Sequence, residues 1–187
     1  MGNIYNIQIN YIKKTTALLL VAILCSTSLF TRAQGTKDAC LLISDEQINK
    51  IIGCKVKQSG PSILKGARCT HKAADFKSDI TLEYYDWHAA KTAQDMIKMN
   101  FDLEKKNIAE KHLSGGIFTA FKDFSAGGQN AFIETGAGDL TTNGNVVRMQ
   151  FLIGSVVFTF DTRGIDMNKV VPNLDKIYAI IKTNYKQ

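Results

Sequence analysis

The fold is decided near the carboxyl end of the chain, by residues 146–162, VVRMQFLIGSVVFTFDT. Two runs rich in β-branched and aromatic residues, 146–153 and 156–162, flank a tight step at Gly154 and Ser155. Residues of this kind favour extended strands, and a two-residue loop joins antiparallel neighbours. The stretch therefore predicts a pair of antiparallel strands.

Three helices are predicted around this pair. The first follows Ser44, which lies three residues before a glutamine as in a capping box, and it ends at Gly53. The second covers residues 88–106, which contain no glycine or proline. The third follows Pro172, which suits the first turn of a helix. Its apolar residues recur at helical spacing along one stripe: Leu174, Ile177, Tyr178, Ile181 and Tyr185.

Four further strands complete the predicted sheet, at residues 68–73, 79–86, about 118–124 and near 130–134. Residues 55–66, which contain Ser-Gly-Pro-Ser, are predicted to form a loop. The resulting order is helix, two strands, helix, four strands, helix. We therefore predict an α+β fold, in which helices pack on one face of an antiparallel β-sheet.

Residues 1–33 have the pattern of a secretory signal peptide. Lys13 and Lys14 precede the apolar run 17–24, and Thr31-Arg32-Ala33 places small residues before a cut at Gln34. The apolar run is shorter than the roughly 20 residues of a membrane span. We predict a leader at 1–33 and one compact domain at 34–187, with no transmembrane segment after cleavage. The protein is then exported, to the periplasm or outside the cell.

Two alternatives would keep the protein at a membrane. One is a leader that is not cleaved. The other is a lipid on Cys25, although Ala22 and Leu24 stand where a lipoprotein signal has a leucine and a small residue.

The predicted mature domain has a small net charge. The chain carries 23 Lys and Arg against 17 Asp and Glu, a formal net charge of +6. Lys13, Lys14 and Arg32 belong to the leader, which contains no acid, so the mature part has 20 basic against 17 acidic residues. Nucleic-acid binding needs a clustered basic face, and we predict no nucleic-acid partner. We expect a monomer or a weak dimer.

Three cysteines follow the leader, at Cys40, Cys54 and Cys69. In an oxidising compartment two of them are expected to form a disulfide and the third to remain a thiol. All three pairings are compatible with the residues alone.

Several short segments resemble a family of secreted bacterial domains of unknown function related to the PsbP-like fold. They are residues 39–44, 51–53, 69–71 and 127–132. The resemblance implies a disulfide between Cys40 and Cys69, and it leaves Cys54 as the free thiol. It implies no catalytic motif. The chain departs from the family at 128–130, Gly-Gln-Asn, where the family has a glycine followed by an acid.

No constellation of residues predicts catalysis, a cofactor or a metal. His71, His88 and His112 are not at ligand spacing from one another, and the chain has no Gly-x-Ser-x-Gly elbow or EF-hand loop. Cys69 and His71 alternate on one strand and could supply two metal ligands. A disulfide cysteine beside an incidental histidine is the simpler interpretation of these two residues. For nucleophilic catalysis, the one alternative is a thiolate of Cys54 paired with a distant histidine.

One predicted surface could recognise a partner. If Ile80, Leu82 and Tyr84 face the helices, the alternate residues of that strand lie on the opposite side of the sheet. Aromatic rings beside an arginine and a carboxylate suit recognition, whereas an ordinary solvated sheet face is the alternative. The candidate binding residues are Tyr85, Trp87, Arg148, Gln150, Asp161 and Arg163.

We therefore predict an exported, non-catalytic binding domain that recognises a partner protein or a small ligand through the open sheet face. An exported hydrolase-type enzyme is the first alternative, and it would need a deep pocket that gathers His88 or His112 with a carboxylate. An envelope-associated structural protein is the second alternative.

Overall fold

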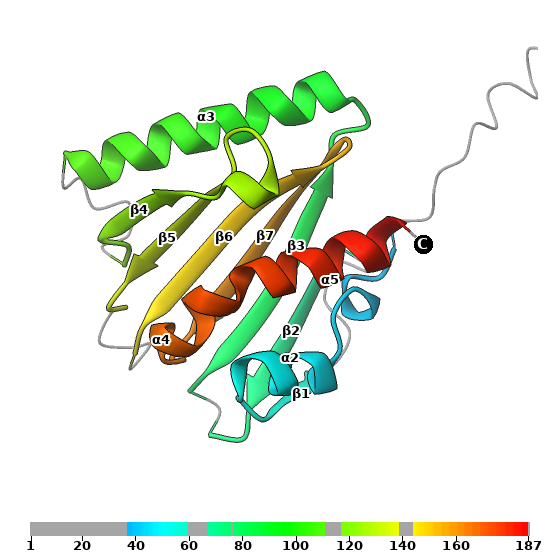
Figure 1. Cartoon of the computed structure of the whole chain (residues 1–187), viewed down its shortest axis with the longest axis vertical. Coiled ribbons are helices and arrows are strands. Elements are labelled where there is room, and N and C mark those ends of the chain that lie inside the picture. The colour runs from blue at the N-terminus through cyan, green and yellow to red at the C-terminus, as the bar shows by residue number, and fades with distance from the viewer. Residues whose placement is uncertain (1–36, 60–66, 76, 111–116, 139–143, 187) are drawn as a thin grey trace, which may run out of the picture. The chain divides into compact units, whose positions relative to one another are not determined.

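The computed structural model describes residues 37–59, 67–75, 77–110, 117–138 and 144–186. The predicted leader at 1–33 lies outside these residues. In the described part of the chain, seven strands form one antiparallel sheet in the order β1-β2-β3-β7-β6-β5-β4 (Figure 1). The strands are β1 (Val56–Gln58), β2 (Arg68–Ala73), β3 (Asp79–Asp86), β4 (Ala120–Asp123), β5 (Phe132–Gly136), β6 (Val146–Ile153) and β7 (Val156–Arg163).

Four α-helices and three 3₁₀ turns accompany the sheet in the described residues. None of these helices is both long and apolar enough to span a membrane. They are α2 (Asp45–Ile52), α3 (Ala90–Ala109), α4 (Met167–Val170) and α5 (Leu174–Lys186), with the turns η1 (Ala39–Leu41), η2 (Ser125–Gly127) and η3 (Val171–Asn173).

Strands β6 and β7 form the predicted hairpin, with Ile153 opposite Val156 across the turn. Gly154 has a φ of 65°, a left-handed conformation that glycine adopts without a steric penalty. β7 also pairs with β3, and β6 with β5, so the hairpin lies inside the sheet. The prediction for residues 146–162 is confirmed.

The alternation of side chains gives the sheet two faces. The core face carries Phe151 of β6 and Phe158 of β7, whose rings stack 5.2 Å apart. Helices α2 and α5 pack there, and Figure 1 shows α5 running across the central strands. The second face carries the alternate residues, and on it Ala93 and Ile97 of α3 pack against Val157 of β7.

The α+β class and the antiparallel sheet are confirmed. Helix α3, however, packs on the second face, whereas all helices were expected on one face. The reason lies at the tip of the hairpin, where Leu152 and Val157 are apolar on the second face, next to Ile153 and Val156 on the core face. This end of the hairpin is therefore apolar on both faces, and strands covered on both faces lose the alternation of polar and apolar residues.

A short strand, β1, lies where the sequence predicted a loop. It pairs with β2, and the backbone N–H of Gln58 donates to Oδ2 of Asp45 at 3.0 Å. Three residues are too few to show the alternation of polar and apolar side chains by which a strand is predicted from sequence. This strand is instead held by backbone pairing with β2 and by the bond from Gln58 to Asp45.

The disulfide between Cys40 and Cys69 is confirmed, and it joins η1 to β2. Cys54 is the free thiol of the described residues and is half-buried.

Replacing Cys40 and Cys69 together by alanine should lower the free energy of unfolding by about 3–4 kcal/mol, since the bridge closes a loop of 29 residues. Guanidinium denaturation under non-reducing conditions measures this loss. Cys54→Ala is the control and should cost less than about 1 kcal/mol. An equal loss in both variants would contradict a stabilising role for the bridge.

Candidate functional site

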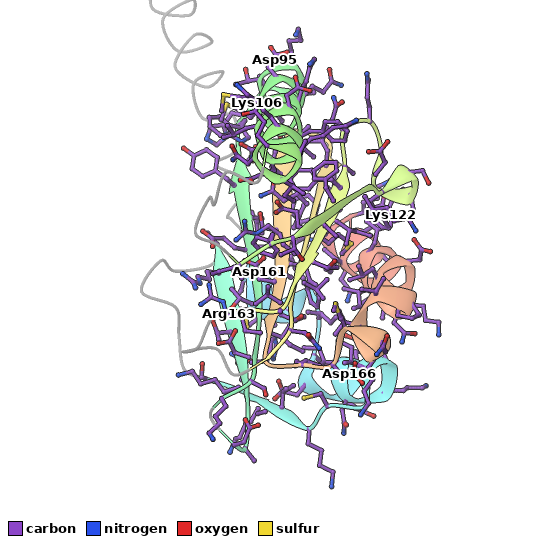
Figure 2. The ribbon with its side chains drawn as sticks, turned by 90° about the vertical axis from the view of Figure 1, so that its left-hand side faces the viewer. Asp95, Lys106, Lys122, Asp161, Arg163 and Asp166 are labelled. Atoms are coloured by element: carbon purple, nitrogen blue, oxygen red, sulfur yellow. A yellow bond between two sulfur atoms is a disulfide. The ribbon has the colours of Figure 1, made fainter. Side chains whose placement is uncertain are left out.

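The register of the strands places all six predicted binding residues on or beside the second face. Figure 2 shows Asp161 and Arg163 on one side of the sheet, away from α5. The face divides into two parts, an aromatic cleft next to α3 and a charged cluster centred on Arg148. Tyr85 lies next to the last residue of β3 and Trp87 directly follows the strand, Arg148 and Gln150 lie on β6, and Asp161 and Arg163 lie on β7.

The aromatic cleft has a volume of about 160 Å³ and lies between α3 and the β3 side of the sheet. The rings of Tyr85 and Trp87 lie 4.6 Å apart, centroid to centroid, at 52° to each other. Tyr85 is 62% exposed, so its ring forms part of the outer rim. Met96, Asn100, Gln150, Val157 and Thr159 are among the other lining residues.

Two amide side chains meet in this cleft. Nδ2 of Asn100 donates to Oε1 of Gln150 at 3.1 Å. Within the described part of the chain, the amide oxygen of Asn100 and the amide nitrogen of Gln150 have no hydrogen bond. The cleft therefore offers one acceptor and one donor group beside its aromatic wall.

The turn from β3 into α3 positions Trp87. Its backbone N–H donates to the Ser155 carbonyl at 3.0 Å, and the Ser155 hydroxyl donates to Asp86 at 2.7 Å. Asp86 also accepts from the backbone N–H of His88, which has a φ of 59°. These bonds tie the end of β3 to the β6–β7 turn and so fix the indole against α3.

The charged cluster follows from the strand register. Arg148 lies opposite Glu134 of β5 and opposite Asp161 of β7. Its Nε donates to Oδ1 of Asp161 at 2.9 Å, and its Nη1 lies 3.6 Å from Oε2 of Glu134. The guanidinium carbon lies 4.7 Å from the centre of the Phe118 ring, within range of a cation–π interaction.

Glu134 is the member of this cluster that sequence reasoning missed. Its side chain is 0% exposed, and neither carboxylate oxygen has a hydrogen-bond partner among the described residues. Burial, followed by repulsion from the carboxylate of Glu104, raises the pKa of Glu134 to about 7, although Arg148 acts in the opposite direction. The sequence holds a partial signal, since Glu134 ends a predicted strand, but only the register shows that it meets Arg148.

The Cys69–His71 pair is not a metal site. Cys69 is in the disulfide and cannot act as a thiolate ligand. His71 is buried, and its Nδ1 lies 2.5 Å from Oδ1 of Asp45, so it ties β2 to α2. Among the described residues, no group of three or more His, Cys, Asp or Glu side chains could hold a metal ion.

The described residues among those considered for catalysis are not gathered in a pocket. His88 is 87% exposed, beside Asp86 at 3.7 Å, and does not line the aromatic cleft. His112 lies outside the described residues. Burial, reinforced by the nearby Asp75 carboxylate, raises the pKa of the Cys54 thiol, which disfavours the thiolate that nucleophilic attack requires.

No protein-family model matches the chain, and no solved structure matches it. The relationship to PsbP-like domains stays a prediction. We therefore infer function from the geometry of the second face.

Glu134→Gln should make stability rise relative to the wild type as pH increases from about 4.5 to 7. The folded protein holds the Glu134 proton up to a pKa of about 7, whereas the ordinary value is 4.5. The folded state thus binds more protons in this interval, and the stability of the wild type falls as pH rises through it. The difference in unfolding free energy between variant and wild type should grow by about 3 kcal/mol.

Urea denaturation at intervals between pH 4.5 and 8.5 measures this difference, in which the other titrating groups largely cancel. Glu83→Gln, which removes an exposed carboxylate from β3 on the same face of the sheet, is the matched control. A constant difference between Glu134→Gln and the wild type would contradict a proton held by Glu134.

Proposed function

We propose that this protein is an exported, non-catalytic binding domain that recognises a partner protein through the second face, with the aromatic cleft as the pocket for one partner side chain. The single observation that carries the proposal is the small cleft lined by the rings of Tyr85 and Trp87 and by the hydrogen-bonded amides of Asn100 and Gln150.

The size of the cleft favours a protein partner over a small ligand. Its volume is about 160 Å³, whereas sites for small molecules and cofactors are typically about 300–1,000 Å³. The cleft suits one ring-sized group. Binding energy in protein interfaces concentrates on a few anchor residues that fill such pockets near the centre of the contact.

The lining of the cleft suits a partner side chain that is partly apolar and partly polar. Tyr85 and Trp87 offer apolar ring surface, and Asn100 and Gln150 offer a hydrogen-bond acceptor and donor. A partner side chain with an apolar body and a polar edge can contact the rings and also hydrogen-bond to the amides. The hydrogen bonds matter because an amide group that the partner buries without a hydrogen bond would lower the affinity. Tyrosine, tryptophan and arginine are also the residues enriched at interface centres.

The surroundings of the cleft supply a polar rim. Glu83 is exposed at its border, and Arg163 is exposed farther along the same face. Rim charges of this kind affect the rate of association and the choice of partner more than they affect affinity.

Two features support the exported part of the proposal. Residues 1–33 have the pattern of a signal peptide. The disulfide between Cys40 and Cys69 is of the kind that persists in oxidising compartments.

Peptides selected on the folded domain from a displayed random library should share one aromatic or amphipathic residue at a fixed position. The double variant Tyr85→Ala and Gln150→Ala should bind these peptides at least tenfold more weakly, a loss of about 1.4 kcal/mol or more. Trp87 is the only tryptophan of the chain, so its fluorescence reports occupation of the cleft directly.

Leu41→Ala is the control for this experiment, since Leu41 is 76% exposed in η1 and does not line the cleft. Both variants should keep the melting temperature of the wild type. Peptides that bind the double variant as tightly as the wild type, or that leave Trp87 fluorescence unchanged, would place recognition elsewhere.

A further inference from the structure

A second cleft, of about 400 Å³, lies at the β4 edge of the sheet on its core-face side. The register pairs Ala120 with Thr135 and Lys122 with Ile133, so these four residues share one face of β4 and β5. They form one side of the cleft, and the segment from α4 to η3 forms the other, with Met167, Asn168, Val171 and Pro172.

The cleft exists because the helical cover of the core face stops short of the sheet edge. Helix α4 contacts β6, and α5 packs on the central strands. Ala120 and Lys122 of the edge strand β4 remain exposed. The cleft has the volume of a small-molecule site and lining that is largely apolar, which is typical of such sites.

Among the described residues that line this cleft, the charge comes from a single side chain, that of Lys122. The polar side chains that accompany it in this part of the lining are those of Thr135 and Asn168. Within the described part of the chain, Lys122 has no ion pair. Figure 2 shows Lys122 on the α5 side of the sheet, opposite to Asp161 and Arg163.

We propose that this cleft binds a single-chain amphiphile with a carboxylate head group, a fatty acid, whose chain lies along the apolar lining and whose head pairs with Lys122. An apolar chain removes the lining from water, and Met167 can adapt its flexible side chain to it. One lysine matches the single negative charge of a carboxylate, whereas no second cation among the described residues lines the cleft to match a dianion. The site is distinct from the proposed recognition surface.

The matched probes are dodecanoate and dodecyltrimethylammonium, which have the same chain length and opposite head-group charge. Titration calorimetry on the mature wild-type protein, below the critical micelle concentration, should show saturable binding of one dodecanoate. It should bind the cationic probe at least tenfold more weakly. Lys122→Met should weaken dodecanoate at least tenfold and bring the two probes close together in affinity.

Two further variants separate the cleft from general surface binding. Ala120→Trp places a large side chain at an exposed position of the cleft and should abolish binding of dodecanoate while the protein stays folded by circular dichroism. Lys57→Met removes an exposed lysine from β1, at the opposite edge of the sheet, and should bind dodecanoate like the wild type.

Failure to saturate at one dodecanoate, or equal affinity of the wild type for the two probes, would overturn the proposal. So would wild-type binding by Lys122→Met or by Ala120→Trp. Because no described residue lines both clefts, these outcomes leave the peptide experiment on Tyr85 and Gln150 unaffected.

Discussion

The alternation of side chains along β6 and β7 is the constraint on which the rest of the structure depends. One set of residues, with Phe151 and Phe158 stacked at its centre, forms the core with α2 and α5. The alternate set brings Arg148 opposite Asp161 and Gln150 opposite Thr159. A slip of one residue in this register would exchange the two faces and bury an arginine in the core. Burial of the phenylalanines therefore also determines the composition of the candidate recognition surface.

Features that depend on neighbouring residues in the chain could be predicted from the sequence. The hairpin follows from two β-prone runs, and the start of α2 from the capping box of Ser44 and Gln47, which is present. The bridge from Cys40 to Cys69 followed from a resemblance rather than from spacing. The side of the sheet that α3 covers could not be predicted, because it depends on Ala93 and Ile97 meeting Val157 from a distant strand. The burial of Glu134 likewise requires the pairing of β5 with β6.

Glu134 and Asp161 share Arg148, and this arrangement has consequences for the adjacent cleft. A buried carboxylate without hydrogen bonds destabilises the fold unless it takes up a proton or gains a cation. Arg148 is held by Asp161 on one strand and faces Phe118, so its side chain has little freedom. Gln150 follows two residues later on the same face of β6 and is held by Asn100. The polar groups of this face are therefore largely preorganised, which lowers the entropy that a partner must remove on binding.

The two clefts are linked to α3 in different ways. Trp87 and Asn100 place the aromatic cleft directly against this helix. Phe121 lines the cleft at the β4 edge, stacks on Phe132 at 5.1 Å, and meets Phe101 of α3 edge-on, also at 5.1 Å. These rings hold the short edge strand against α3 from the second face, while Ala120 and Lys122 on the opposite side of β4 line the second cleft. Helix α3, whose side of the sheet could not be predicted from the sequence, thus forms one side of the aromatic cleft. It also supports β4, the strand that lines the other cleft.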